Sequence, residues 1–300
     1  MHAYVIGNAV IDETILVDQW PAAGASIFGR QGSSDLGGKG ANQAVVMARC
    51  GLPTSLVAPV GDDFRAGTIA ERLAAEPVQS RLVRLAGHAT DFSIIFTTPD
   101  GENAIVTTAD AAENLRPADA LAALAQAEAG DMAVLQGNLS EATTKALLRE
   151  ARGRGMVTVF NPSPLRPAFP ALWPLVDIAF LNAGEARALT GAEREAAAAV
   201  LHAQGVGEVV LTLGSGGALL GGSGSAPIRV AAAPATAVDT TGAGDTFTGV
   251  ALASALLRGT RLDELALLHA ARASALTVSR KGTSSAFPSV EEMSAILAQR

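Results

Sequence analysis

A run of small residues followed by a carboxylate opens an apolar helical stretch in the last quarter of the chain, Val-Asp-Thr-Thr-Gly-Ala-Gly-Asp-Thr-Phe at residues 238–247. Small residues let backbone N–H groups converge on an anion, and the amino end of a helix adds about half a positive charge. Such a site suits the charge of a transferring phosphoryl group, and Asp245 can accept the proton of an attacking hydroxyl. The segment therefore predicts phosphoryl transfer to an alcohol. Alternatively, Gly242 and Gly244 only form a tight turn, and Asp245 only caps the helix.

A second glycine turn opens another amphipathic helix, with the sequence Gly-Gly-Lys-Gly-Ala-Asn-Gln at residues 37–43. Three glycines allow the backbone to approach a polyhydroxylated ligand closely. The segment lacks the Gly-Lys-Ser/Thr ending of a Walker A loop, and it is not the dinucleotide fingerprint G-x-G-x-x-G. It is weak evidence when taken alone.

The elements that must position these motifs alternate between short apolar runs and amphipathic helical stretches. This order is typical of an α/β fold with a mostly parallel central sheet and helices on both faces. The expected buried strands are residues 3–7, 55–60, 132–135, 156–160, 176–181 and 208–213. The expected C-terminal helices are 243–258, 262–279 and 290–299, with Pro288 as a helix-start residue for the last of them.

Two segments, residues 13–35 and 88–109, break this rhythm because they carry β-type residues without intervening helices. We expect them to form hairpins of a small separate β-sheet, a lid on a core domain made of residues 1–12, 36–87 and 110–300. Turn residues at Pro99-Asp100-Gly101 and at 221–225 mark hairpin ends. Isolated hairpins expose unpaired edges, so a homodimer through the lid is expected.

The composition narrows the class of partner. A chain of 300 residues with a formal net charge of −7 and no stripe of Lys and Arg is not expected to bind nucleic acid. The single cysteine, Cys50, excludes disulfides within the chain and a cysteine-rich metal site. No apolar run is long enough to span a bilayer and no basic region precedes the first one, so no membrane association and a cytoplasmic location are expected.

The two glycine motifs, in this order and with this α/β pattern between them, resemble the ribokinase family of carbohydrate kinases, also called the phosphofructokinase B family. The resemblance extends over essentially the whole chain. Three shorter matches join the motifs, Asn-Pro-Ser-Pro at 161–164, Asn-Ala-Gly-Glu at 182–185 and Thr-Leu-Gly-Ser-Gly-Gly at 212–217. The resemblance implies a ribokinase-like Rossmann-type sandwich with a small β-sheet lid that often forms the dimer interface. It also implies an ATP-dependent kinase acting on a small sugar.

Residue by residue, the resemblance implies that Asp245 is the catalytic base. The anion hole would come from the backbone amides of Gly242, Ala243 and Gly244. The residues implied to contact the sugar are Asp12, Gly38, Lys39 and Asn42, with Asn138 at a further substrate position.

For ATP, the resemblance implies contacts from Asn182, Thr212, Gly214 and Gly217, with His269 against the adenine. Asn182 and Glu185 match an N-x-x-E motif that helps to hold Mg²⁺ through water, and Mg²⁺ needs few protein carboxylates. Without the resemblance, Glu185 would be a helix-surface charge and His269 a helix residue at the edge of the core.

A potassium site beside the anion hole is implied as well. Its ligands would be the Asp239 side chain and backbone carbonyls of four residues, Thr241, Thr277, Arg280 and Gly282. A serine that usually completes this site falls at Ala286, and Ser285 could replace it.

Two positions depart from the family pattern at the sugar site. Val10 stands where an Asn is usual, two residues before Asp12, and Asn138 stands where a Glu is usual. A hydrogen bond to a charged group is worth about 1.5 to 3 kcal/mol, so these changes affect which sugar is accepted. Ribose remains the leading candidate, and Val10 would suit a deoxysugar.

Other acceptors and other classes of protein stay open at this point. A different sugar, a polyol or a nucleoside could take the phosphoryl group, although an aromatic content of 4% offers little surface for a nucleoside base. A non-catalytic nucleotide-binding protein of the same fold would require loss of Asp245 or its glycines, which are present. A Rossmann dehydrogenase is not supported, because no glycine-rich dinucleotide turn follows the first strand.

Overall fold

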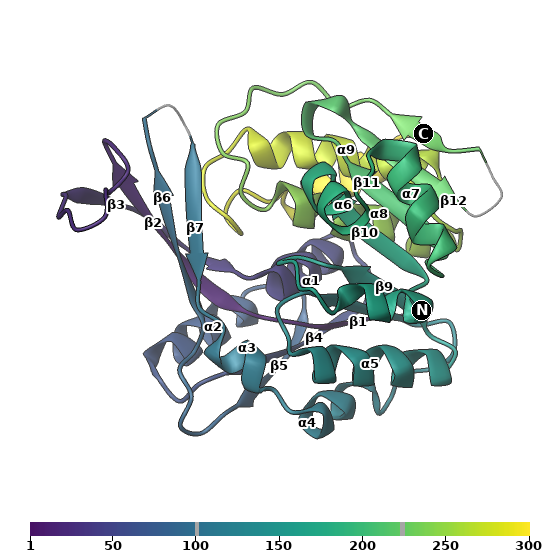
Figure 1. Cartoon of the computed structure of the whole chain (residues 1–300), viewed down its shortest axis with the longest axis horizontal. Helices are drawn as coiled ribbons and strands as arrows, with labels where there is room; N and C mark the ends of the chain where they lie inside the picture. Colours follow the sequence, from purple (N-terminus) through teal and green to yellow (C-terminus); the bar gives the residue numbers. More distant parts are fainter. Residues whose placement is uncertain (100–101, 223–225) are drawn as a thin grey trace.

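The computed structural model describes residues 1–99, 102–222 and 226–300. Within these ranges the chain forms a large sheet covered by helices and a smaller sheet that projects from it (Figure 1). The large sheet has the strand order β13-β12-β11-β10-β9-β8-β1-β4-β5. Its strands, in that order, are Ile228–Val230, Ala218–Gly222, Glu208–Thr212, Ile178–Asn182, Val157–Asn161, Met132–Gln136, Ala3–Ile6, Thr54–Val60 and Gln79–Arg84.

The strands from β11 to β5 pair in parallel, and β12 pairs antiparallel with both β11 and the edge strand β13. The mostly parallel α/β sheet is therefore confirmed. The six expected strands correspond to β1, β4, β8, β9, β10 and β11. The edge strand β5 was not expected, because its residues Gln-Ser-Arg-Leu-Val-Arg are mostly polar and form no apolar run.

Helices cover both faces of this sheet. One face is covered by α1 (Lys39–Arg49), α2 (Phe64–Ala74), α8 (Ala243–Arg258), α9 (Glu264–Val278) and α10 (Val290–Leu297). The other face carries α4 (Pro117–Leu121), α5 (Glu141–Gly153), α6 (Ala183–Thr190) and α7 (Arg194–Ala203). The short helix α3 (Asp110–Asn114) and the 3-10 turns η1 (Ala122–Leu124), η2 (Phe169–Leu175) and η3 (Gly214–Gly216) complete the chain.

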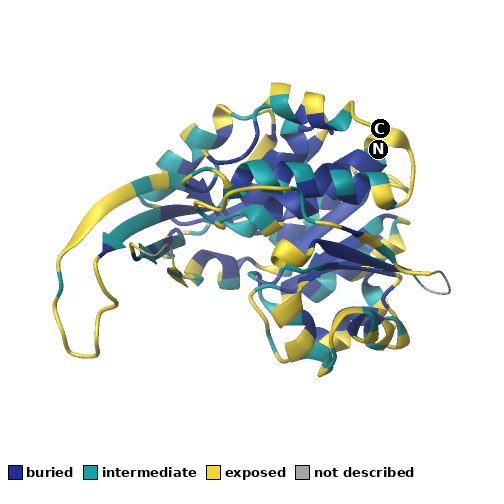
Figure 2. Ribbon diagram, turned by 90° about the horizontal axis from the view of Figure 1, so that it is seen from above, coloured by how far each residue is buried: buried dark blue, intermediate teal, exposed yellow. Residues whose placement is uncertain are grey.

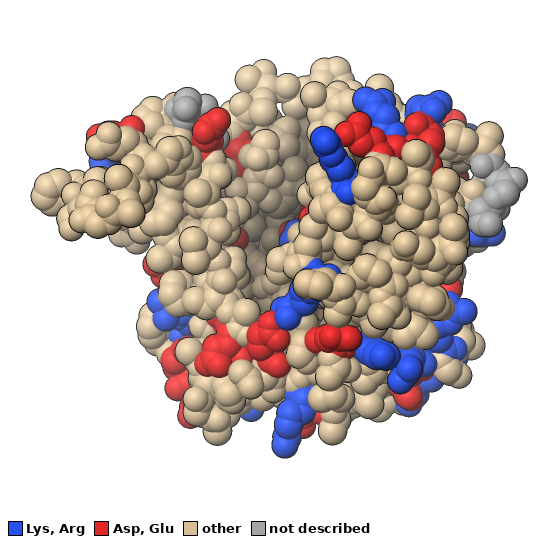
Figure 3. All heavy atoms as spheres, in the orientation of Figure 1, with Lys and Arg blue, Asp and Glu red and all other residues tan. Residues whose placement is uncertain are grey.

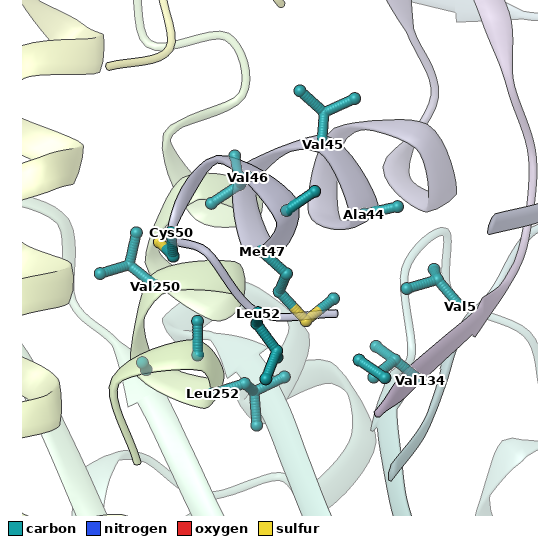
Figure 4. Close-up of a cluster of buried hydrophobic side chains, with 14 of the residues drawn as sticks. Val5, Ala44, Val45, Val46, Met47, Cys50, Leu52, Val134, Val250 and Leu252 are labelled. Atoms are coloured by element: carbon teal, nitrogen blue, oxygen red, sulfur yellow. The ribbon is translucent and has the colours of Figure 1, made fainter. Parts of the chain in front are cut away.

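The two faces of the sheet hold two separate hydrophobic clusters, because successive strand residues point to opposite sides. Val5 and Val134 belong to the cluster under α1 and α8, whereas their neighbours Ile6 and Leu135 belong to the cluster under α5. Met47 of α1 points down toward Val5 and Val134 in the first cluster (Figure 4). Packing in the first cluster thus fixes α1 and α8 relative to the sheet.

The smaller sheet has the strand order β3-β2-β6-β7, with strands Gly29–Gly37, Val10–Val17, Phe92–Thr97 and Asn103–Thr107. It projects at the left of Figure 1, and much of it is exposed in Figure 2, as expected of a lid. β2 and β3 extend past the expected boundaries at residues 13 and 35, and the division into core and lid domains at those boundaries stays a prediction. Of the expected turns, Asp100 and Gly101, like residues 223–225, lie outside the described residues.

The three C-terminal helices form close to their expected positions. α8 has the predicted bounds, whereas α9 begins two residues later than predicted and α10 ends two residues earlier. Pro288 does not start α10, because Ser289 is the N-cap and pairs with Glu292 in a capping box. The structure contains no helix, within the residues it describes, that meets the length and hydropathy needed to cross a bilayer.

Candidate active site

Four polar residues end four consecutive parallel strands of the large sheet: Gln136 of β8, Asn161 of β9, Asn182 of β10 and Thr212 of β11. Gln136 is in register with Asn161, and Asn182 is in register with Thr212. The carboxyl ends of parallel strands form the edge where α/β proteins bind ligands. Figure 3 shows the surface hollowed between the lid and the core on the face seen in Figure 1.

The amino end of α8 faces this edge. Its N-cap, Gly242, has φ of 75°, and a Cβ there would lie 2.6 Å from Phe287, so only glycine fits. A Cβ at Gly244 would meet nothing within 4 Å, so the backbone is open to a ligand at that point. The Ala243 amide donates to the Thr240 carbonyl at 3.3 Å. Of the three amides expected in the anion hole, Ala243 therefore already has a backbone acceptor in this structure.

Asp245, in the first turn of α8, is 5% exposed and held at both carboxylate oxygens. Asn42 Nδ2 donates to Oδ2 at 2.9 Å, and Gln43 Nε2 donates to Oδ1 at 2.9 Å. Lys39 Nζ lies 3.8 Å from Oδ1. The structure thus joins the two glycine motifs, since all three partners of Asp245 come from α1.

The glycine turn before α1 packs against the end of β1. Gly38 has φ of 90°, and a Cβ there would lie 2.9 Å from the Asn8 carbonyl oxygen. The amides of Gly40 and Ala41 donate to the Asn8 side chain and carbonyl at 3.3 and 3.0 Å. This packing directs Lys39 and Asn42 toward Asp245. The Asn42 Oδ1 atom is buried without a hydrogen-bond partner among the described residues, so it is free to accept from a ligand.

Asp12 belongs to a polar row that crosses the lid. Asp35, Asp12, Ser93 and Thr107 are successive register partners on β3, β2, β6 and β7, and we call them the lid row. Register partners project from the same face of a sheet. Ser93 and Thr107 share a hydrogen bond of 3.0 Å. The lid thus presents an expected sugar ligand, Asp12, among hydroxyl groups.

The lid row is fastened to the segment after α9. Thr283 Oγ1 donates to Asp12 Oδ2 at 2.8 Å, and Asp35 Oδ2 accepts from the Thr283 amide and the Ser285 hydroxyl, both at 3.0 Å. Burial raises the pKa of Asp12, and hydrogen bonds from Ser93 and Thr283 oppose that rise. A sugar hydroxyl donating to Asp12 would further favour its ionised form.

The two departures from the family pattern lie at the start of β2 and just after β8. Val10 is fully buried at the start of β2, where it pairs with Gly37, so its side chain adds an apolar surface and no hydrogen bond. Asn138 follows β8, and its Oδ1 atom is buried with no hydrogen-bond partner in the part of the chain that the structure describes. Arg166 donates to the Gly137 and Asn138 carbonyls at 2.9 and 3.1 Å, and these bonds hold the loop that follows β8.

A pocket opens between the strand ends and the amino end of α8. It is lined by Lys39, Asn161, Phe180, Leu181, Asn182, Glu185, Thr212, Gly244 and Thr248. Asn182 Oδ1 accepts from the Glu185 amide at 2.8 Å, and Glu185 Oε2 accepts from the Asn182 amide at 2.9 Å. This capping box starts α6, a role that the Asn-x-x-Glu spacing also indicates. Glu185 Oε1 remains as the atom that could receive a magnesium-bound water.

Other residues expected at the nucleotide lie outside this pocket's lining. Gly214 and Gly217 bracket the turn after β11 with φ of 58° and 85°, and a Cβ at Gly217 would collide with the Val230 carbonyl. His269 is 1% exposed, and its ring nitrogens lie 2.8 Å from Ser254 Oγ and from the Gln299 carbonyl. Burial lowers the pKa of His269. Its side chain therefore has the packing of a core residue, with no free nitrogen for adenine.

The residues expected at potassium meet beside α8. Asp239 accepts from the amides of Thr241 and Gly282 at 2.9 and 3.2 Å, which brings the segments before α8 and after α9 together. Thr277 and Arg280 lie at the end of α9 and just after it, and the Thr277 carbonyl accepts from the Arg280 amide at 3.1 Å. One carboxylate and several nearby carbonyls are oxygen ligands of the kind that a hard cation accepts. Ala286 is fully buried and offers no side-chain oxygen, whereas Ser285 bonds to Asp35.

The comparisons with known proteins agree with this geometry. The chain is 32% identical over 293 residues to ribokinase of Bacillus subtilis (strain 168), with 98% of each chain covered. Among solved structures, it resembles ribokinase from Thermotoga maritima with a TM-score of 0.88 and 26% identity over 99% of both chains. It also resembles Arabidopsis thaliana ribokinase complexed with ribose and ATP, with a TM-score of 0.86 and 29% identity over 99% of both chains.

The protein is a sugar kinase, an enzyme that transfers a phosphoryl group to an alcohol. The family model described as pfkB family carbohydrate kinase matches residues 2–290, so the chain belongs to that family.

Proposed function

We propose that this sugar kinase transfers the γ-phosphoryl group of ATP to the primary hydroxyl of ribose and releases ribose 5-phosphate and ADP. The observation that carries this proposal is the Asp245 carboxylate, buried at the amino end of α8 and held by amide donors from α1. The similarity to proteins named ribokinase, one of them complexed with ribose and ATP, supports ribose as the acceptor.

In the proposed reaction, the sugar hydroxyl donates its proton to Asp245 as its oxygen forms a bond to the γ-phosphorus. The bond between that phosphorus and the β,γ-bridging oxygen breaks, and ADP leaves with the bonding electrons. The amides of Gly242, Ala243 and Gly244 would stabilise the charge on the transferring group, together with the positive end of the α8 dipole. For Ala243, this requires that its amide leave the Thr240 carbonyl.

We assign the sugar to the space between the glycine turn before α1 and the lid row. Gly38, Lys39 and Asn42 would bind it from the core, and Asp12 from the lid. Asn42 Oδ1 and Asn138 Oδ1 are buried acceptors without partners among the described residues. A buried acceptor without a hydrogen bond costs free energy, and a sugar hydroxyl donating to either atom would remove that cost.

The phosphates of ATP would occupy the pocket beside Asn182 and Thr212, with the nucleoside extending toward Gly214 and Gly217. Mg²⁺ would be held through water by Glu185 and would neutralise charge on the phosphates. K⁺ is the proposed occupant beside Asp239, with carbonyls of Thr241, Thr277, Arg280 and Gly282. The dependence on ATP agrees with the cytoplasmic location expected from the sequence, and we propose a homodimer formed through the lid.

Deoxyribose is the second candidate acceptor, because Val10 places an apolar side chain where a hydrogen-bonding residue is usual. The two acceptors differ by one hydroxyl, and a site built to bond a hydroxyl rejects the analogue that lacks it. If Val10 faces the missing hydroxyl, kcat/KM will be higher for 2-deoxyribose than for ribose.

The test is ATP consumption by the purified protein, with Mg²⁺ and K⁺, against ribose, 2-deoxyribose, other pentoses, hexoses, polyols and nucleosides. Asp245→Asn is the control, and we expect it to keep ATP binding and to lose at least about a hundredfold in turnover. Turnover of ribose well above the control supports the proposal. Near-normal turnover by Asp245→Asn would refute the base assignment, and activity on another acceptor alone would refute ribose.

A further inference from the structure

Gln43 holds Asp245 as Asn42 does, but it cannot serve a ligand. Its side chain has no solvent-exposed surface, whereas Asn42 retains a buried acceptor without a partner. Gln43 Nε2 donates to Asp245 Oδ1 at 2.9 Å and lies 3.4 Å from Asn161 Oδ1. Any effect of Gln43 on the proposed reaction must therefore pass through its partners, of which Asp245 is bonded at the shorter distance.

The orientation of the Gln43 amide is set by its neighbours at the strand ends. Gln136, the last residue of β8, donates from Nε2 to Gln43 Oε1 at 2.8 Å. Asn161, the last residue of β9, donates from Nδ2 to the Phe180 carbonyl at 2.9 Å, which leaves its Oδ1 toward Gln43. A flipped Gln43 amide would turn its carbonyl oxygen toward the Asp245 carboxylate and its NH₂ toward that of Gln136. These neighbours therefore direct the NH₂ group at Asp245.

The Gln136 amide is held in turn by close packing. Its Oε1 atom lies where a side chain at Gly7 would project, so the glycine that follows β1 makes room for it. Gln136 has no solvent-exposed surface either. The side-chain amides of Gln136 and Gln43 thus form a hydrogen-bonded chain from the end of β8 to the Asp245 carboxylate. We call these two residues the amide pair.

An aspartate carboxylate can take a broad range of rotations about its last side-chain bond, so its plane is fixed only by hydrogen bonds or packing. With Oδ2 bonded to Asn42 and Oδ1 bonded to Gln43, the plane of the Asp245 carboxylate is fixed. Each oxygen keeps a second lone pair, which can receive the hydroxyl proton. A misplaced reacting group can lower a rate by about a hundredfold without loss of binding.

We propose that Gln43, oriented by Gln136, is a positioning residue that sets the rotation of the Asp245 carboxylate for proton transfer. This inference rests on the function proposed above. Its consequence is a reduced kcat with little change in KM when the amide pair is broken, because neither residue has surface for the sugar or for ATP.

The test compares Gln43→Met, Gln136→Met and the double variant, with kcat and KM measured for sugar and ATP. We expect Gln43→Met to lower kcat by about 10- to 100-fold, with both KM values within about threefold of the parent. Gln136→Met should lower kcat by a smaller factor and have no further effect in the Gln43→Met background. The double variant remains informative if Gln43→Met folds poorly, because it removes both ends of one hydrogen bond.

A cycle with Asp245→Asn distinguishes positioning from general damage. In the Asp245→Asn background, Gln43→Met should leave the residual turnover unchanged, because the group that it positions is gone. Thr158→Val is the matched control, since it removes partly buried hydrogen bonds to Leu175 and Asp177 at the opposite end of β9. We expect this control to lose stability and keep kcat.

The outcomes separate this inference from the proposed function. If Asp245→Asn loses turnover but Gln43→Met does not, the positioning role is wrong and the base assignment stands. If Gln43→Met lowers the residual turnover of Asp245→Asn by the same factor as it lowers that of the parent, the positioning role is also wrong. Near-normal turnover by Asp245→Asn would instead overturn the proposed function itself.

Discussion

At the scale of single residues, Asn182 and Glu185 belong both to a helix cap and to the lining of a pocket. They cap α6 by bonding to each other's backbone amides, and they line the pocket assigned to the phosphates. A capping box accepts Gln as readily as Glu at its third helical position. The structural role can therefore be kept while the charge proposed to hold magnesium is removed.

Glu185→Gln is expected to leave the thermal midpoint near that of the parent and to raise the Mg²⁺ concentration for half-maximal activity by about tenfold or more. The measurement is ATP consumption over a magnesium titration, with thermal unfolding beside it. Glu193→Gln serves as control, because Glu193 forms an exposed ion pair with Arg187. An unchanged magnesium dependence in Glu185→Gln would show that Glu185 only caps α6.

Residues that act within one contiguous motif could be found from the sequence, and those that act across strands could not. Gly242, Gly244 and Asp245 are consecutive enough for their chemistry to be inferred from spacing. Gln136 and Asn161 are ordinary polar residues at strand ends, and only the register of β8 with β9 brings them beside Gln43. The sequence signal that could have indicated these residues is a polar residue at the end of each of several buried strands.

At the scale of elements, the end of α9 is connected to α10 by an ion pair. Arg280 donates through both terminal nitrogens to Glu292, at 3.0 and 2.6 Å, and the Ser289 amide adds a bond of 2.9 Å to the same carboxylate. The Arg280 guanidinium, with the Ser289 amide, lowers the pKa of Glu292 to about 2. This pair steadies the segment that carries carbonyls assigned to potassium.

The lowered pKa of Glu292 predicts a pH-dependent stability. Because the carboxylate is favoured in the folded state, its contribution is present above the unfolded pKa near 4.5 and is lost as pH falls toward about 2. Glu292→Gln should therefore lower the free energy of unfolding at pH 7, with a difference that shrinks below about pH 4.5. Both side chains are about one-third exposed, so solvent screening limits the difference to about 1 kcal/mol.

The measurement is urea denaturation of parent and Glu292→Gln from pH 7 to pH 3. Glu71→Gln is a suitable control, because Glu71 is exposed on α2 and takes part in none of the described ion pairs. A difference that stays constant down to pH 3 would contradict the assignment.

The elements themselves were predicted best where burial leaves a strong pattern. α8 is buried along most of its length, and its apolar run gave its bounds. β5 lies at the sheet edge and its residues are mostly polar, and it was missed for that reason. The position of His269 on a helix was predicted from the sequence, but its full burial was not. Its ring lies between Ser254 and Gln299, and this depends on how α8, α9 and the C-terminus pack.

At the scale of the whole molecule, the lid leaves large apolar side chains in solvent. Phe28 is 101% exposed, Val106 63% and Ile105 53%, and these residues lie just before β3 and on the edge strand β7. Edge strands with exposed apolar residues favour pairing with another chain. A second lid would cover both the edge and the apolar residues.

The homodimer prediction is checked by sedimentation velocity at micromolar concentration. We expect the parent to sediment as a dimer and Val106→Lys to shift it toward monomer, because a charge on β7 opposes edge pairing. Leu257→Lys is the matched control, since Leu257 is 46% exposed on α8, away from the lid. A parent that sediments as a monomer would contradict the prediction.

The site also joins parts of the chain that are made far apart in time. Asp245 bonds to Asn42 and Gln43 across 203 and 202 positions, and β1 pairs with β8 as well as with β4. Contacts so distant in sequence close late in folding, because loop closure costs entropy before the contact is gained. A chain that is still being synthesised lacks the proposed catalytic base until Asp245 has been added, even if most of its sheet has formed. The return of catalytic activity during refolding would therefore time the docking of α8 against α1, one of the last steps expected in assembling the molecule.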